Sequence, residues 1–331
     1  MKTIYLLCLH NVRTGGPEAI HQLSDSLLKQ GFDARMVYYN RGHIARLEGG
    51  PIDEEGYHFS DAPEYMRCQF DEYAHYATRI ESAVPNSTDA IVVLPEVICH
   101  LTPKFNKATV LVWWLSVDNA FGALSRVNLN HLRHEPKVRH AAQSDYAKAF
   151  VETLKLNHNF PVDKLTDYTP LESGPLLQWY ERPRLVAINA NEHKVIYSPD
   201  ALAAAIQAID PEIMIEKIQG GVDTDALFKR ARLYVDCGNF PGRDRMPREA
   251  SRRYCQVLML AAGAATYPDM EMWHPTRWHV WSDVGLKRLA EEVVECVKMA
   301  DEQIPLGMGS SPHNYERTQF DSEVAGLFSG L

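Results

Sequence analysis

Residues 234–250 read Tyr-Val-Asp-Cys-Gly-Asn-Phe-Pro-Gly-Arg-Asp-Arg-Met-Pro-Arg-Glu-Ala. The β-branched and aromatic start predicts a buried strand, the Gly/Pro segment predicts a turn, and Pro247 predicts the start of a helix. In such a unit the free N–H groups and the positive dipole end of the helix face whatever fills the turn. The stretch therefore predicts an α/β fold with an anion site at the end of a strand.

Arginines concentrate in this segment: five lie between Arg243 and Arg253, in a chain of formal net charge −9. A local reversal of sign in an acidic protein favours a small phosphate-bearing ligand over a polyanion. We expect Arg243 and Arg245 to bind phosphate beside Gly242 in the turn. Glu249, expected at about the third helical position, offers acceptor oxygens to a pair of sugar hydroxyls. The alternative for Glu249 is a first-turn acid that favours the helix dipole and pairs with Arg253. We interpret the segment as a nucleotide-sugar site.

The composition is that of a globular protein with room for two cores, since 45% of the 331 residues are hydrophobic and 23% are charged. The apolar start is too short for a signal peptide, and no later segment approaches 18 apolar residues, so we expect a cytoplasmic protein. The six cysteines are scattered without a CxxC pair, which argues against a disulfide framework and a zinc site. Without a basic tail, nucleic acid is not an expected partner.

Strand and helix patterns alternate along the chain, which predicts parallel sheets covered by helices. Strands are expected at residues 3–10, 32–39, 89–95, 109–117, 138–142, 185–189, 214–218, 233–237 and 257–260. Helices are expected at residues 17–30, 146–156, 200–209, 223–230, 247–254, 284–300 and 321–328. Residues 40–63 are polar and Gly-rich and are predicted to form a long surface loop.

The alternation breaks where prolines cluster between residues 164 and 183, which indicates a domain boundary. The predicted organisation is an N-terminal Rossmann-like domain at 1–170, a linker at 171–183, a C-terminal Rossmann-like domain at 184–303 and a tail at 304–331 that packs back on the body. Two Rossmann-like domains facing across a cleft are the expected fold.

Several candidate residues directly follow predicted strands, where ligands bind in open parallel sheets. Gly15 and Gly16 lie between the first strand and the first helix, and paired glycines let the backbone approach a ligand closely. The alternative is an ordinary tight turn in which Glu18 favours the helix dipole. Glu96 and Asp118 each follow a further strand.

Asp118 is a candidate general base for an acceptor hydroxyl, and the alternative is an N-cap for the segment after it. Glu96 is the rival base on the same geometric argument. Trp113 and Trp114 are adjacent on a strand and point to opposite faces, so one is expected in the core. We expect the other, Trp114, to stack on a sugar or a base.

Metal and dinucleotide sites are not predicted. Asp223-Thr-Asp225 looks like the acidic triplet that carries a metal-nucleotide in some transferases, but Asp223 precedes a helix and is better explained as its N-cap. The fourteen histidines show no metal-ligand spacing. The turn after the first strand lacks GxGxxG, which disfavours a dehydrogenase.

Four motifs, spread over roughly residues 3–265, together resemble a family of GT-B glycosyltransferases found in bacterial surface-polysaccharide gene clusters. The motifs are Gly15-Gly-Pro-Glu18 with His21-Gln-Leu23, Trp113-Trp-Leu-Ser-Val-Asp-Asn119, Ala142-Gln-Ser-Asp-Tyr-Ala147 and the segment 234–250. The resemblance implies a metal-independent sugar transferase whose first domain binds the acceptor and whose second binds the nucleotide-sugar. It also implies that Arg243 and Arg245 bind the diphosphate and that Glu249 binds donor hydroxyls. Asn189 and Lys194 are then expected in the donor loop.

One departure from the family keeps other functions open. Many retaining GT-B enzymes carry a second Glu eight positions before the helix-start Glu, and this chain has Pro241 there. A nucleotide-sugar epimerase and a non-catalytic GT-B-like binding subunit are the alternatives. For a transferase, the expected acceptor is a growing glycan, lipid-linked forms included, with peripheral contact at the inner membrane face. The sequence leaves inverting and retaining chemistry open.

Overall fold

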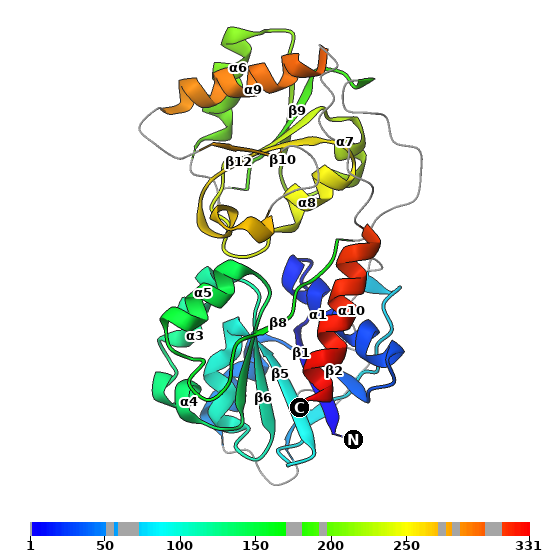
Figure 1. The fold of residues 1–331 in the computed structure, drawn as a ribbon, viewed down its shortest axis with the longest axis vertical. Helices are drawn as coiled ribbons and strands as arrows, with labels where there is room; N and C mark the ends of the chain where they lie inside the picture. Colours follow the sequence, from blue (N-terminus) through cyan, green and yellow to red (C-terminus); the bar gives the residue numbers. More distant parts are fainter. Residues whose placement is uncertain are drawn as a thin grey trace. The chain divides into compact units, whose positions relative to one another are not determined.

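The computed structural model describes residues 2–50, 56–58, 73–169, 181–191, 197–270, 276–279, 285–301 and 313–331 (Figure 1). The chain divides into two compact units. Unit 1 comprises residues 1–168 and 315–331, and unit 2 comprises residues 169–314. The division after residue 168 lies next to the predicted boundary at residue 170. Each unit is a parallel sheet covered by helices, as the alternating pattern predicts.

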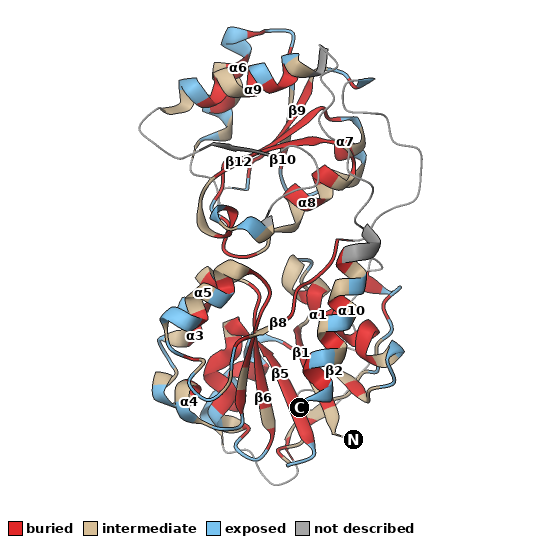
Figure 2. Cartoon of the chain, in the orientation of Figure 1, coloured by how far each residue is buried: buried red, intermediate tan, exposed pale blue. Residues whose placement is uncertain are grey.

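Unit 1 is built on a six-stranded parallel sheet in the order β2-β1-β5-β6-β7-β8. Its strands are β1 (Thr3–Leu9), β2 (Ala34–Tyr39), β5 (Ala90–Pro95), β6 (Thr109–Trp114), β7 (Val138–Ala142) and β8 (Asp163–Lys164); β3 (Tyr57–His58) and β4 (Ala83–Val84) form a separate antiparallel pair. Both faces of the sheet are covered, so the central strands are apolar without alternation, and all six residues of β5 are buried (Figure 2).

Helices pack on both faces of this sheet. One hydrophobic core joins the sheet to α1 (Gly15–Lys29) and α10 (His313–Ser329). The other core involves α2 (Arg41–Gly49), η3 (Glu96–Lys104), η4 (Val117–Ala120), α3 (Phe121–Leu124), α4 (Leu129–His134) and α5 (Asp145–Thr153). The strand ends that follow β1, β5 and β6 are thus held from both sides.

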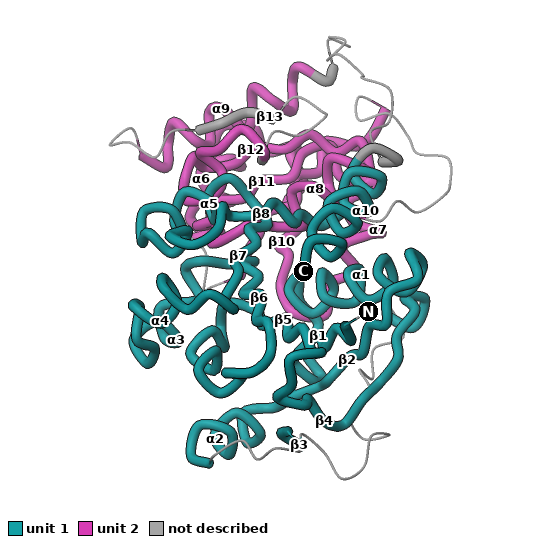
Figure 3. The backbone as a smooth tube through the Cα atoms, turned by 60° about the horizontal axis from the view of Figure 1, so that its bottom comes forward, with its two compact units in different colours: residues 1–168, 315–331 teal, residues 169–314 magenta. Residues whose placement is uncertain are grey.

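The C-terminal tail belongs to unit 1, although unit 2 precedes it in the sequence (Figure 3). The helix begins at residue 313, earlier than the predicted 321. Phe320 and Val324 enter the core beside α1. The backbone N–H and the hydroxyl of Thr166 both donate to Oε2 of Glu323, at 2.7 Å each. Apolar packing and these hydrogen bonds together bind α10 to the N-terminal part of the chain.

Unit 2 is a five-stranded parallel sheet in the order β10-β9-β11-β12-β13. Its strands are β9 (Leu185–Asn189), β10 (Met214–Ile218), β11 (Leu233–Asp236), β12 (Gln256–Leu260) and β13 (Thr276–His279). α6 (Pro199–Ile209) and α9 (Gly285–Asp301) cover one face, and α7 (Thr224–Arg230) and α8 (Arg245–Arg252) cover the other (Figure 1). The short 3-10 turns η6 (Gly263–Thr266) and η7 (Pro268–Met270) follow β12.

The predicted surface loop at 40–63 is wrong over α2. Asn40 caps this helix: its side chain accepts the N–H of His43 at 3.0 Å, and the backbone N–H of Asn40 donates to Nδ1 of His43 at 3.2 Å. Ile44 and Leu47 then lie in the core of unit 1. Capping and two apolar residues stabilise a helix whose other residues are mostly polar.

His140 of β7 is a buried histidine with a defined tautomer. Nε1 of Trp114 donates to Nδ1 of His140 at 3.1 Å, and Nε2 of His140 lies 3.1 Å from the carbonyl oxygen of Leu132, to which it donates. Burial lowers the pKa of His140 to about 4. A proton added at Nδ1 would remove the acceptor of Trp114, so the folded state requires the neutral ring.

We therefore expect acid to destabilise unit 1 through His140. Between pH 6.5 and 4 the unfolded state binds a proton that the folded state does not, so stability is present above pH 6.5 and is lost by about 3 kcal/mol as the pH falls to 4. Urea unfolding of His140→Gln across this range should lack this loss. His134→Gln, at an exposed histidine, is the control and should keep it. An unchanged acid loss in His140→Gln would contradict the prediction.

Candidate functional site

Three candidate segments of unit 1 meet at one edge of its sheet. β1, β5 and β6 are adjacent and parallel, so the residues after each strand collect at the carboxyl edge. Glu18, Glu96 and Asp118 lie in these segments. The edge therefore brings together the acidic residues predicted from the sequence for this unit.

Glu96 opens η3 directly after β5. Its side chain is buried, and Oε2 accepts the backbone N–H of Leu115 at 3.0 Å. Burial raises the pKa of Glu96 to about 7, although hydrogen bonds from the backbone of Leu115 and Ser116 act in the opposite direction. A carboxyl group in this range changes charge near neutral pH.

Asp118 lies in η4, after β6, and is partly exposed. Its Oδ1 accepts the hydroxyl hydrogen of Tyr146 in α5 at 2.8 Å. The N-cap position of η4 belongs to Ser116, so the interpretation of Asp118 as an N-cap is wrong. A partly exposed carboxylate held by a hydroxyl donor is suited to accept a proton from a bound ligand.

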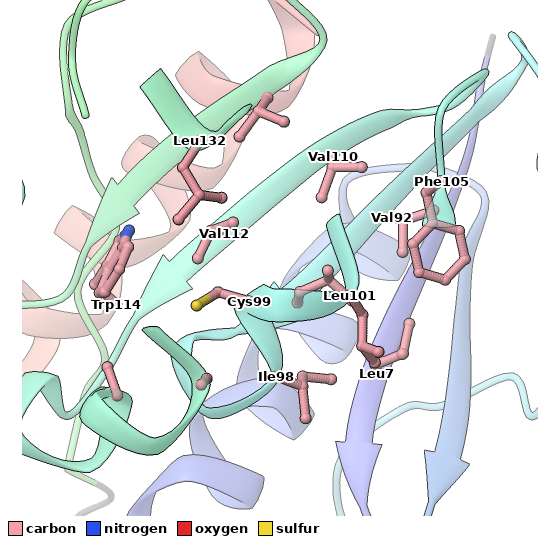
Figure 4. Close-up of a cluster of buried hydrophobic side chains, with 14 of the residues drawn as sticks. Leu7, Val92, Ile98, Cys99, Leu101, Phe105, Val110, Val112, Trp114 and Leu132 are labelled. Atoms are coloured by element: carbon pink, nitrogen blue, oxygen red, sulfur yellow. The ribbon is translucent and has the colours of Figure 1, made fainter. Parts of the chain in front are cut away.

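Trp114 was expected to stack on a ligand, and this prediction is wrong. Trp113 and Trp114 do point to opposite faces of the sheet, but both faces are covered and both side chains are 0% exposed. Trp114 packs among Leu132 and Val112 in the core (Figure 4), and its N–H is bonded to His140. It is a core residue with no face open to a ligand.

The glycine pair lies within the first turn of α1. The helix begins at Gly15, with Thr14 at the N-cap position, where the sequence predicted a loop as far as Gly16. A Cβ built at Gly16 would lie 3.9 Å from Cδ1 of Leu115, which is an ordinary contact. Glu18 accepts the hydroxyl hydrogen of Tyr76 at 2.9 Å. The helix start is thus packed close to the segment that follows β6.

A buried network ties together the strand ends of unit 2. Asp236 at the end of β11 accepts hydrogen bonds from the side chains of Asn189 (3.1 Å) and Tyr234, and from the backbone N–H of Gly238 (3.0 Å). Asn189 is 1% exposed, and its Oδ1 also accepts the N–H of Asn191. Asn189 therefore supports the edge, in place of the direct donor contact predicted for it. Lys194 lies outside the described residues.

α8 starts earlier than predicted, at Arg245 instead of Pro247, so Glu249 is its fifth residue. Nη2 of Arg245 lies 3.2 Å from Oε1 of Glu249, and both side chains are partly buried. Arg253, the partner proposed for Glu249, instead forms an ion pair with Asp225. A guanidinium and a carboxylate thus lie next to each other at the start of this helix.

The turn between β11 and α8 is held from inside the protein. Arg248 is buried, and its guanidinium donates to the carbonyl oxygens of Arg243 (3.0 Å) and Asp244 (3.2 Å). The carbonyl of Phe240 accepts the N–H of Ala264 at 2.8 Å. Gly263 has a φ of +54°, and a Cβ there would lie 2.3 Å from the same carbonyl oxygen, so only glycine fits. Gly242 and Arg243 belong to this fixed turn.

The acidic triplet at 223–225 has structural partners. Asp223 accepts the N–H of Ala226 at 3.1 Å as the N-cap of α7, which confirms the capping prediction. Asp225 pairs with Lys229 and Arg253. Within the described ranges, no three His, Cys, Asp or Glu side chains gather in a way that could hold a metal ion. None of the helices in this part of the chain is both long and apolar enough to span a membrane.

Sequence reasoning missed the partners of the candidate carboxylates. Tyr146 donates to Asp118 across 28 residues, and Tyr76 donates to Glu18 across 58 residues. Tyr146 does lie in the quoted 142–147 motif, but no spacing in the sequence relates either tyrosine to its acceptor.

No protein-family model matches the sequence, and no curated protein matches it. Solved structures do resemble it. TarM of S. aureus, in complex with Fondaparinux, alpha-GlcNAc-glycerol and UDP, gives a TM-score of 0.57 at 8% identity, covering 99% of this chain and 100% of that one. The pneumococcal O-GlcNAc transferase GtfA, with UDP and GlcNAc, gives 0.56 at 10% identity, covering 98% and 96%. Anabaena HepE, with UDP and glucose, gives 0.57 at 10% identity, covering 100% of both chains.

These similarities concern the fold. They confirm the predicted class, an α/β protein with the two Rossmann-like domains of the GT-B architecture.

Proposed function

We propose that this protein is a glycosyltransferase that moves a sugar from a nucleotide-diphosphate donor to a growing bacterial surface glycan. The observation that carries the proposal is the fixed turn after β11, which leads through Arg243 into α8 with Arg245 beside Glu249. Several structures that share the fold were determined with UDP, which supports a nucleotide-diphosphate ligand.

On the donor side, unit 2 would bind the nucleotide-sugar. Arg243, Arg245 and the N–H groups at the start of α8 would stabilise the negative charge of the departing diphosphate, in place of a metal ion. Glu249, next to Arg245, would accept hydrogen bonds from hydroxyls of the donor. The donor is a substrate, and no further cofactor is proposed.

On the acceptor side, unit 1 would bind the glycan, lipid-linked forms included. Asp118 or Glu96 would take the proton of the attacking hydroxyl. Gly15, Gly16 and Glu18 lie at the same sheet edge and would contact this substrate. We place the reaction in the cytoplasm, with peripheral contact at the inner membrane face and no nucleic-acid partner.

Arg245→Ala is expected to weaken binding of the nucleoside diphosphate by about 1.5–3 kcal/mol, the range of a charge-assisted hydrogen bond. Isothermal titration calorimetry with each candidate diphosphate measures this difference. Arg230→Ala is the matched control, because Arg230 is an exposed arginine of α7 paired with Glu216, and it should bind like the wild type. Equal affinity of Arg245→Ala and the wild type would disprove the arginine-turn site.

A thermal-shift screen of UDP-, GDP-, CMP- and dTDP-linked sugars and NAD(H) tests the function. A donor that raises the midpoint of the wild type more than that of Arg245→Ala supports the site and names the nucleotide. Donor turnover without any acceptor would indicate an epimerase. Binding without turnover would indicate a non-catalytic subunit, which Pro241 keeps in view. Stabilisation by NAD(H) alone would indicate a dehydrogenase.

A further inference from the structure

We infer that the two carboxylates at the edge of unit 1 have different tasks: Asp118 takes the proton of the acceptor, and Glu96 is a positioning residue that holds the turn carrying Asp118. The inference rests on the proposed transferase function and adds which of the two residues touches the substrate. It follows from where each carboxyl group lies and what it contacts.

The contact of Glu96 arises because β5 and β6 end at different levels. Pro95, the last residue of β5, pairs with Trp113, and the chain then leaves the sheet at Glu96. β6 runs on, so the N–H of Leu115 lies beyond the last strand residue of β5. The Glu96 carboxylate accepts this N–H at 3.0 Å. The side chain of Glu96 thus replaces a backbone partner that β5 no longer supplies.

The segment from Leu115 to Asp118 is a short, internally bonded turn. The backbone N–H of Asn119 donates to the carbonyl of Ser116 at 2.9 Å, and its side-chain amide donates to the Ser116 hydroxyl at 2.9 Å. Tyr146 donates to Asp118 at the far end of the turn. Because the turn is held at Leu115 by Glu96 and at Asp118 by Tyr146, the Leu115 bond helps to fix the Asp118 carboxylate.

Exposure separates the two residues. Glu96 is 2% exposed, and Cys99, which follows it in η3, is fully buried. An acceptor hydroxyl could reach the Glu96 carboxyl only by displacing the turn that covers it. Asp118 is partly exposed at the same edge. Asp118 is thus the carboxylate placed to meet a substrate.

The surroundings of Glu96 carry little charge. Its titratable neighbours are Tyr39 at the end of β2 and Cys99 in η3, with Cys8 of β1 beside Tyr39. Burial raises the pKa of Cys99 to about 12 and that of Tyr39 well above its usual value, so both are neutral. Burial likewise raises the pKa of Glu96 to about 7. An ionised carboxylate accepts a stronger hydrogen bond, so the hold on Leu115 should tighten as the pH rises through 7.

The test compares Glu96→Gln and Asp118→Asn in sugar transfer between pH 5.5 and 9. The glutamine keeps an acceptor oxygen for Leu115 but has no charge, so at pH 8 kcat should fall only about 3–10-fold with KM unchanged, and the pH step near 7 should disappear. Asp118→Asn should lose about 10²–10⁴-fold. Glu81→Gln is the matched control, because the Glu81 carboxylate also accepts a backbone N–H, that of Ser82, and it should behave like the wild type.

A loss in Glu96→Gln as large as that in Asp118→Asn would overturn the inference and make Glu96 the base. A pH step near 7 retained in Glu96→Gln would also overturn it. Hydrogen exchange gives a readout that needs no activity: Glu96→Ala should lose at least about tenfold protection at the Leu115 amide, and Asp118→Asn should keep it. Unchanged exchange in Glu96→Ala contradicts the positioning role. Absence of transfer by the wild type with any donor would instead count against the proposed function.

Discussion

Asp118→Asn is expected to reduce kcat for sugar transfer by about 10²–10⁴-fold, the contribution typical of a general base. Asparagine has nearly the same shape and keeps an oxygen that can accept the hydroxyl hydrogen of Tyr146, so the turn should remain in place. It cannot take a proton. Initial rates at saturating donor and acceptor measure the change, and KM for the donor should stay within about twofold, since the donor is proposed to bind unit 2.

Asp145→Asn is the control for this prediction. Asp145 lies one residue before Tyr146, is partly exposed and forms an ion pair with Lys164, so the same chemical change occurs beside the site without touching it. Its kcat should equal that of the wild type. If Asp118→Asn kept more than about a tenth of the wild-type kcat, Asp118 would not be the base.

The central strands could be predicted from sequence because parallel strands buried on both faces are nearly all apolar. The strand predicted at 89–95 corresponds to β5 at 90–95 for this reason. α2 was missed because its apolar residues are few, and its clearest signal is the Asn40–His43 cap. A cap of this kind depends on local spacing, so it was available in the sequence. The early start of α8 was missed because Pro247 was placed at the first helical position. Proline is tolerated throughout a first turn, where N–H groups have no helical partner.

The site could be predicted only as far as strand order determines it. Residues after adjacent parallel strands meet at one edge, which is why Glu96 and Asp118 were identified together. The sequence could not show that helices cover both faces at Trp114, or that Tyr146 donates to Asp118. Burial and pairing at these positions depend on segments distant in the chain. The different exposures of Glu96 and Asp118, which separate their proposed tasks, have the same origin.

Arg182→Met is expected to destabilise unit 2 by about 3–5 kcal/mol. Arg182 is 1% exposed and lies where two helices end. Its guanidinium donates to the carbonyl oxygens of Phe228 and Ala231, at 2.7 Å each, and to that of Arg253. These are the last carbonyls of α7 and α8, which have no helical partners and carry the negative ends of the helix dipoles. Methionine can fill the space but cannot donate, so buried carbonyls would lose their partner, at about 1–3 kcal/mol each.

Because the chain has two units, the measurement must resolve unit 2. Hydrogen exchange of peptides from β9 and β11 in increasing urea gives its opening free energy, while peptides from β5 report on unit 1. The control is Arg184→Met, two residues along, where a 31% exposed arginine pairs with Asp210 and Glu212 at the surface and the expected loss is about 0–1 kcal/mol. Arg182→Lys serves if the methionine variant does not fold. A single ammonium group cannot reach all three carbonyls with the fork geometry of a guanidinium, so lysine should recover only part of the stability. Equal losses at residues 182 and 184 would show that the buried guanidinium does not hold the two helix ends, because the matched surface arginine makes no such contacts.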